Sequence, residues 1–122
     1  MPIRGNLLAW QWSDYAPKHR ARANLLIHVV AVPLFAAGLI CLVFGVVLAD
    51  WVTAAVGLVA VLVGFVAQGL GHGNEPERPV PFLGPADFIS RFLAEQFITF
   101  PRFVISGGWW ANLRGRDPPR RL

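Results

Sequence analysis

Imidazole is the side chain of this sequence best suited to chemistry, and the chain carries three, at His19, His28 and His72. Neutral imidazole is a common ligand of zinc and iron, and a neighbouring carboxylate adds an oxygen donor. The candidate carboxylates are Glu75, Glu77 and Glu95. If the three rings meet, they form a site suited to iron(II) with open positions, or to zinc.

A histidine beside an apolar segment also has a simpler interpretation. It can hydrogen-bond at a helix end, or extend its ring to the lipid head groups, without binding a metal. The spacing of the histidines does not decide between these interpretations. The elements that carry the histidines have to decide it.

Two long apolar segments lie between the chain ends. Residues 25–49 and 51–70 contain no Asp, Glu, Lys or Arg, and each matches the roughly 20 residues needed to cross a hydrocarbon core of about 30 Å. The chain is 55% hydrophobic and 15% charged, which excludes most soluble folds of this size. We therefore expect an all-α integral membrane protein built on a helical hairpin, with spans at about 24–49 and 51–71.

The hairpin brings two of the histidines to one depth. His28 lies 22 residues before Asp50 and His72 lies 22 residues after it, so both reach the same level of an antiparallel helix pair. His19 needs a bend, because nine residues of continuous helix would place it about 13.5 Å from His28 and on the opposite face. A break within residues 18–24 would bring it in.

Glycines are spaced alike on the two spans. Gly38 and Gly45 are seven residues apart, as are Gly57 and Gly64. A turn centred near residue 51 would pair Gly38 with Gly64 and Gly45 with Gly57, which lets the two backbones approach closely in a membrane. Glycine is also common in membrane helices without such pairing.

A third helix, amphipathic or re-entrant, is expected at about 86–106. Its charged residues Asp87, Arg91, Glu95 and Arg102 fall on one narrow stripe at 100° per residue. Such a helix lies at the membrane interface, or enters the membrane with its polar stripe turned towards the bundle.

These elements form a single membrane domain. Trp and Tyr side chains among basic residues indicate an N-terminal interfacial helix, and two tryptophans followed by arginines indicate a basic tail. The expected segments are an interfacial N-terminal segment (1–22), a transmembrane hairpin (23–72), a ligand-bearing loop (73–85), the third helix (86–108) and the basic tail (109–122).

The placement of the positive charges indicates the orientation. The chain has 11 Lys and Arg against 7 Asp and Glu, and every Lys and Arg lies outside residues 23–77. This pattern predicts that both termini are cytoplasmic, and the composition indicates a bacterial inner membrane. Nucleic acid is not an expected partner, because its binding needs basic residues interleaved with exposed aromatic ones. The sequence has no hydrolase elbow and no phosphate-binding loop.

Polar residues on the expected helices have candidate roles around a histidine site. Asn24 and Gln68 can donate hydrogen bonds to a ligating histidine, or can hold the helices together. Arg91 and Arg102 can bind a substrate carboxylate, although salt bridges within the stripe satisfy them as well. Tyr15 can donate a hydrogen bond or a proton at the site, or can simply lie at the interface.

Two motifs at the base of the hairpin contain all three histidines. They read Tyr15-x-x-x-His19-x-x-x-x-Asn24-x-x-x-His28, followed by Pro33, and Gln68-x-x-Gly71-His72-x-x-Glu75, followed by Pro79. The pattern resembles the 2-hydroxy-palmitate dioxygenase family of small multi-pass membrane proteins, from about Trp10 to Phe103. The resemblance implies iron(II)-dependent, oxygen-consuming removal of the carboxyl carbon from a long-chain 2-hydroxy fatty acid, a step of α-oxidation.

The resemblance also implies roles for individual residues. His19, His28 and His72 are the implied iron ligands, and Glu75 is a fourth ligand or orients one. Tyr15 and Glu75 are the expected catalytic residues. The acid would chelate the metal through its carboxylate and hydroxyl, so the expected partners are this acid, O₂ and the lipid bilayer.

Two other classes of function remain open from the residues. A bis-histidine haem protein would clasp its haem between His28 and His72, which lie at equal depth. A non-catalytic membrane hairpin that scaffolds a partner would tolerate replacement of all three histidines. A homo-oligomer is compatible with each of these functions.

Overall fold

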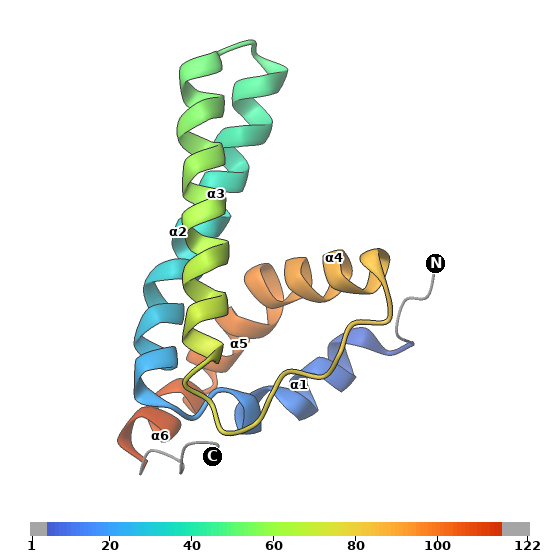
Figure 1. Ribbon diagram of the computed structural model, residues 1–122, viewed down its shortest axis with the longest axis vertical. Coiled ribbons are helices and arrows are strands. Elements are labelled where there is room, and N and C mark those ends of the chain that lie inside the picture. The colour runs from blue at the N-terminus through green and yellow to red at the C-terminus, as the bar shows by residue number, and fades with distance from the viewer. Residues whose placement is uncertain (1–4, 116–122) are drawn as a thin grey trace.

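The computed structural model of the protein describes residues 5–115, which are helical with no strand among them (Figure 1). The elements are α1 (Leu7–Lys18), α2 (Arg22–Val47), α3 (Trp51–His72), α4 (Pro85–Ala94), the π-helical turn η1 (Glu95–Thr99), α5 (Phe100–Ile105) and α6 (Gly108–Arg114). α4, η1 and α5 follow one another as one continuous helical run. The all-α prediction is confirmed for this part of the chain.

α2 and α3 form the antiparallel hairpin, and their ends lie within two residues of the predicted spans. The turn between them is centred on Ala49, which has a φ of 53°. It is closed by the Asp50 carboxylate, which accepts hydrogen bonds from the Thr53 N–H (3.2 Å) and hydroxyl (2.7 Å). By length and composition both helices can cross a membrane, and only 28% and 22% of their most apolar stretches are buried within the protein. Most of their apolar side chains therefore face outward.

The glycines let α2 and α3 approach closely, but in a different register from the predicted one. Because the turn is centred two residues earlier than predicted, Gly38 does not face Gly64 and Gly45 does not face Gly57. Instead Gly38 packs against Gly57, and Gly45 packs against Ala54. The predicted glycine pairs are wrong, whereas the close backbone contact is present.

The corner between α1 and α2 lies at residues 19–21, within the range where a break was expected. α2 has no N-cap side chain of its own. The Glu75 carboxylate, from the loop after α3, instead accepts hydrogen bonds from the two N–H groups just before α2, those of Arg20 (2.9 and 3.1 Å) and Ala21 (3.1 and 3.0 Å). It thereby satisfies donors at the α2 N-terminus and places a negative charge at the positive end of the helix dipole.

The third helix forms where predicted, but its charged residues do not keep one stripe. A π turn adds about one residue, which rotates every later side chain by roughly 100°. Asp87 and Arg91, before η1, are buried, whereas Arg102 is exposed and lies 4.1 Å over the ring of Trp12. The predicted stripe is therefore correct only as far as Glu95.

The predicted basic tail begins with a helix. In α6, Trp109 is buried and its indole N–H donates to the Leu25 carbonyl (3.0 Å), so this tryptophan packs in the protein core and not at a lipid interface. Its neighbour Trp110 is exposed. Residues 116–122 of the predicted tail lie outside the described residues. α6 and α1 thus close the base of the hairpin (Figure 1).

We expect Gly57→Ala to lower the free energy of unfolding by about 1–3 kcal/mol, because its Cβ would press into the backbone of α2 at Gly38 and Leu42. Gly69→Ala, on the same helix, is the matched control. A Cβ at Gly69 meets nothing within 4 Å, and alanine favours the helix by up to about 1 kcal/mol. Denaturant titration in detergent measures both variants, and equal stabilities would contradict the close packing.

Candidate metal centre

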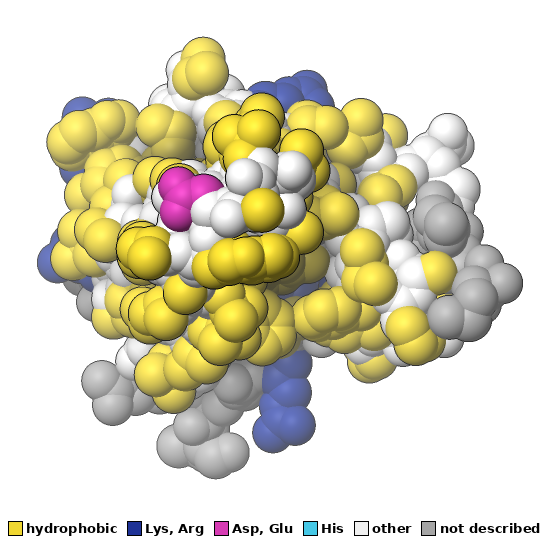
Figure 2. Space-filling model, turned by 90° about the horizontal axis from the view of Figure 1, so that it is seen from above, with side chains coloured by type: hydrophobic (Ala, Val, Ile, Leu, Met, Phe, Trp, Pro, Cys, Tyr) yellow, Lys and Arg dark blue, Asp and Glu magenta, His cyan; other side chains and the backbone are white. Residues whose placement is uncertain are grey.

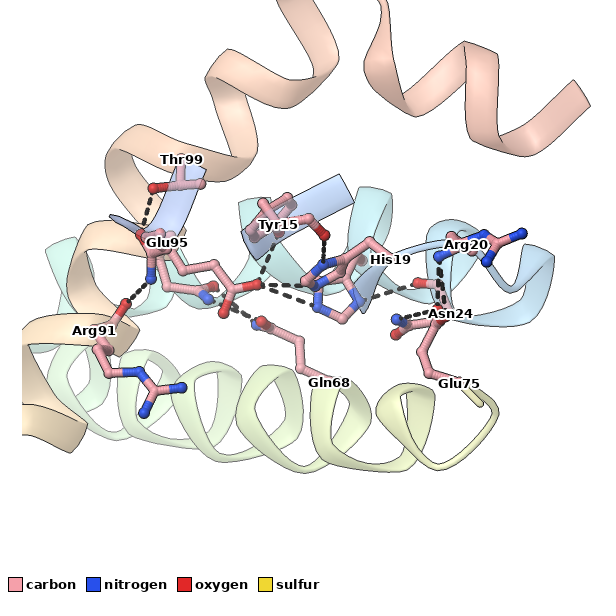
Figure 3. Close-up of polar contacts among 12 residues, drawn as sticks. Tyr15, His19, Arg20, Asn24, Gln68, Glu75, Arg91, Glu95 and Thr99 are labelled. Atoms are coloured by element: carbon pink, nitrogen blue, oxygen red, sulfur yellow. Dashed lines mark hydrogen bonds and ion pairs between the residues drawn. The ribbon is translucent and has the colours of Figure 1, made fainter. Parts of the chain in front are cut away.

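His19, His28, His72 and Glu95 meet at the base of the hairpin, and Figure 3 shows His19 and Glu95 facing each other. The ring centroids lie 4.9 Å apart for His19 and His28, 4.7 Å for His19 and His72, and 5.0 Å for His28 and His72. One ligand atom from each of the four residues lies within 4.8 Å of all the others. They come from the corner, α2, α3 and η1, so only the folded chain assembles them.

Backbone carbonyls fix two of the rings. His19 Nδ1 lies 2.8 Å from the Tyr15 carbonyl oxygen, and His28 Nδ1 lies 3.0 Å from the Asn24 carbonyl oxygen. A carbonyl only accepts, so each Nδ1 carries the proton and each Nε2 keeps its lone pair. Metal-binding histidines are oriented in this way in many proteins.

Three of the four remaining ring nitrogens lack hydrogen-bond partners among the described residues. His19 Nε2, His28 Nε2 and His72 Nδ1 are buried and accept or donate no hydrogen bond among the described residues. Buried polar atoms are almost always paired. Glu95 Oε2 lies 3.3 Å from His19 Nε2 and 3.6 Å from His28 Nε2. A cation among these atoms would satisfy all of them, and three nitrogens with one oxygen suit iron(II) or zinc.

Tyr15 and Glu95 form a buried pair. The Tyr15 hydroxyl donates to Glu95 Oε2 at 2.8 Å. Burial, and then the charge of Glu95, raise the pKa of Tyr15, so the hydroxyl stays protonated and continues to donate. Burial alone would raise the pKa of Glu95, but hydrogen bonds from His19 and His28, and the positive charge of these rings when a second proton sits on Nε2, hold that pKa well below its ordinary value. A cation in place of those protons would keep Glu95 ionised in the same way.

Glu75, a predicted catalytic residue, lies at the α1–α2 corner and not among the histidines. Besides its two backbone donors it accepts a hydrogen bond from Asn24 Nδ2 at 2.8 Å. Asn24 in turn orients His28 through its backbone carbonyl and not through its side chain. Both residues therefore act on the histidines indirectly, by holding the start of α2 (Figure 3).

Three other polar residues were predicted to act at the site, namely Gln68, Arg91 and Arg102, and among the described residues none of them contacts a histidine through a hydrogen bond that the structure shows. Gln68 exchanges two hydrogen bonds of 2.8 Å with Gln96, so it binds α3 to η1 and does not contact a histidine through a hydrogen bond. Arg91 lies beside the site with Nη1 3.2 Å from the Pro81 carbonyl oxygen. Arg102 is exposed over the Trp12 ring and is not part of the histidine cluster.

A pocket of about 420 Å³ opens beside the histidines, between α1, α3, α4 and the loop before α4. Tyr15, His19, His72 and Glu95 form its polar end. Five aromatic side chains also line it, those of Trp10, Phe65, Phe82, Phe88 and Phe92, together with polar and charged residues that include Asp14, Lys18, Gln68 and Arg91. Its volume lies in the range of small-molecule sites. A molecule with a polar head and a long apolar tail matches this lining.

Two contributions to the site were missed or misjudged from the sequence. Glu95 was one of three candidate carboxylates, and its place on the charged stripe with Asp87 and Arg91 indicated an ion pair and not a position among the histidines. Lys18 lines the pocket and pairs with Asp14 (2.8 Å) and Glu77 (3.4 Å). The Asp14 hydrogen bond raises the pKa of Lys18, which keeps a positive charge at the pocket. In the sequence, the position of Lys18 next to His19 was the one hint that Lys18 lies at the site.

Comparison with known proteins gives one match. The family model described as "2-hydroxy-palmitic acid dioxygenase Mpo1-like" matches residues 6–101, which include the three histidines and Glu95. No curated protein and no solved structure matches the chain significantly.

We expect Glu75→Ala to lower the free energy of unfolding by about 2–3 kcal/mol, because it removes a charged acceptor and leaves buried N–H groups unpaired. Glu75→Gln keeps one oxygen and should lose less. Glu77→Ala is the control, since its side chain is 52% exposed and its pair with Lys18 contributes less than about 1 kcal/mol. Denaturant titration gives the values. Equal losses for Glu75→Ala and Glu77→Ala would contradict the role of Glu75 at the corner.

Proposed function

The chain belongs to the Mpo1-like family, and from this premise we propose that it is an iron(II)-dependent dioxygenase of long-chain 2-hydroxy fatty acids. The reaction cleaves the bond between C1 and C2, uses O₂ as the oxidant, and converts the 2-hydroxy acid into an acid one carbon shorter, with C1 released as CO₂ and the remaining oxygen as water. The observation that carries the proposal is the set of buried, unpartnered imidazole nitrogens that face the Glu95 carboxylate. The family supports the substrate class, and the donor set supports the metal.

His19, His28, His72 and Glu95 would hold the metal. Iron(II) bound there supplies the electron-transfer chemistry that dioxygen needs, and leaves positions open for further ligands. The Tyr15 and Asn24 carbonyls keep the His19 and His28 rings in the tautomer that presents Nε2. The Tyr15 hydroxyl holds the Glu95 carboxylate in place, so Tyr15 orients a ligand without having to lose its own proton.

The pocket would bind the acid with its head group at the polar end. Lys18 and Arg91 both line the pocket, and their N–H groups, which also pair with Asp14 and Asp87, are the donors that would bind a substrate carboxylate. The aromatic wall offers apolar surface to the acyl chain. Removal of water around the head group would strengthen these charge interactions.

The hairpin would anchor this site in a membrane. α2 and α3 expose most of their apolar side chains, and basic residues lie at the end of the hairpin opposite Asp50. We therefore place both termini and the histidines on the cytoplasmic side, following the distribution of positive charge. The bilayer then supplies the apolar solvent for the exposed leucines and valines.

A bis-histidine haem is incompatible with this packing. The rings of His28 and His72 lie only 5.0 Å apart, and the His19 ring and Glu95 adjoin both. No space for a porphyrin remains between the two rings. The scaffold alternative is separated from the enzyme by the activity measurement below.

Detergent-solubilised protein, loaded anaerobically with iron(II), is expected to consume O₂ on addition of 2-hydroxyhexadecanoate and to release a 15-carbon acid detectable by mass spectrometry. Hexadecanoate, which lacks the hydroxyl, should give no uptake. His72→Ala should reduce the rate at least 100-fold, whereas Glu77→Gln should change it less than twofold. Absence of uptake by folded, iron-loaded protein would overturn the proposal, and uptake that survives replacement of all three histidines would overturn the assigned site.

A further inference from the structure

The hairpin projects only a limited distance beyond α4. α4 touches the hairpin through Phe92. The ring centroid of Phe92 lies 4.9 Å from that of Phe35 on α2 and 5.3 Å from that of Phe65 on α3, and these two residues mark the height of α4 along the hairpin. From Phe35 to the end of α2 are 12 residues, or about 18 Å, and from Trp51 to Phe65 are 14 residues, or about 21 Å. The hydrocarbon core of a bilayer is about 30 Å thick. The part of the hairpin beyond α4 is therefore too short to cross it.

The tip of the hairpin carries groups that belong at an interface. Asp50 is exposed, and a charge within hydrocarbon is costly. Trp51 is 65% exposed, and tryptophan favours the interface. With this tip at the far interface, about 10 Å of hydrocarbon remains below the level of Phe35 and Phe65. α4 then lies within the acyl-chain region of the cytoplasmic leaflet.

The outer surface of α4 and η1 fits that position. Its exposed side chains include Ile89, Leu93, Phe97 and Ile98, with exposed fractions of 38–55%. The charged residues of the same segment point inward, since Asp87 and Arg91 are buried and the Glu95 side chain is only 13% exposed. Seen along the hairpin from its tip, the surface around the hairpin is mostly hydrophobic (Figure 2).

The aromatic wall of the pocket continues onto this surface. Phe65 and Phe82 line the pocket and are also 41% and 46% exposed. Leu83, next to Phe82, and Leu62, one turn before Phe65, are more than half exposed. The apolar side of the pocket is thus continuous with the apolar exterior between α3 and the loop before α4.

The polar and apolar ends of the pocket are ordered along the hairpin. Phe65 lies seven residues, or about 10 Å, from His72 towards the hairpin tip. The histidines therefore lie near head-group level, and the phenylalanines lie deeper. A free fatty acid in the cytoplasmic leaflet has the same orientation, with its carboxylate at the head groups and its chain in the hydrocarbon.

We propose that the pocket opens sideways into the cytoplasmic leaflet between α3 and the loop before α4, so that a membrane-dissolved acid enters from the side with its chain against Phe65, Phe88 and Phe92. The identity of the acid rests on the proposed function, whereas the lateral opening rests on the fold. Substrate is then exchanged with the bilayer and not with water.

The depth of α4 is tested by spin labelling in phosphatidylcholine nanodiscs. A Cys41→Ala background receives one cysteine at Leu93 on α4, at Val43 on the outer face of α2, or at Arg114 on α6. Oxygen should relax the Leu93 label as strongly as the Val43 label, and a water-soluble nickel chelate should relax only the Arg114 label. A Leu93 label as accessible to nickel as the Arg114 label would overturn the proposal.

The opening is tested with hexadecanoic acid that carries a diazirine on its terminal segment, dissolved in the same nanodiscs and photolysed. Adducts are expected on Phe65, Phe82 and Phe88, and excess 2-hydroxyhexadecanoate should reduce them. Gly69→Trp, which places a bulky ring in the pocket wall on α3, should reduce them at least fivefold. Val66→Trp, on the same helix but outside the pocket, should not.

The outcomes separate this inference from the proposed function. Pocket adducts without O₂ uptake would retain the lateral opening and remove the dioxygenase assignment. O₂ uptake with adducts only on the outer faces of α2 and α3, unaffected by Gly69→Trp, would retain the enzyme and overturn the lateral opening.

Discussion

The buried Glu75 carboxylate holds the corner on which the whole site depends. In a continuous helix from α1 into α2, His19 would point away from His28 and lie about 13.5 Å along the axis. Glu75 supplies an acceptor for the N–H groups of Arg20 and Ala21 and for the Asn24 amide, which stabilises a chain break where the helix would otherwise continue. The break turns His19 over the base of the hairpin. Because Glu75 follows α3 closely, the same contact also ties both ends of the hairpin together.

The second constraint is that polar groups are gathered inside and apolar groups face outward. The ion pairs and amide pairs of the third helix, including Asp87 with Arg91 and Gln68 with Gln96, are buried against α1 and α3. Glu95 keeps the inward direction set by α4, and the π turn that begins there rotates the side chains of α5 about the helix axis, so that Arg102 leaves the stripe. Such a distribution is costly in water and natural in lipid, and it connects the metal centre, the aromatic pocket and the membrane in one account.

Sequence reasoning succeeded where regular geometry decides the outcome. The hairpin bounds, the common depth of His28 and His72 and the need for a break near residue 20 all follow from helix rise and apolar length. It failed where a tertiary contact overrides regularity. Nothing in the local sequence shows that Glu75 binds the chain just before α2 from a distant loop or that the π turn redirects Arg102. Trp109 was likewise assigned to the interface, because the Leu25 carbonyl that receives its N–H is visible only in the fold.

The central claim is that His19, His28, His72 and Glu95 form one metal centre, and iron binding tests it most directly. Anaerobic titration with iron(II), followed by metal analysis, should give one iron per chain. Single alanine substitutions at these four residues should each weaken binding at least tenfold, and Glu77→Ala should bind like the unaltered protein. Iron at the same stoichiometry and affinity in the four variants, or no iron bound by the folded protein, would contradict the account.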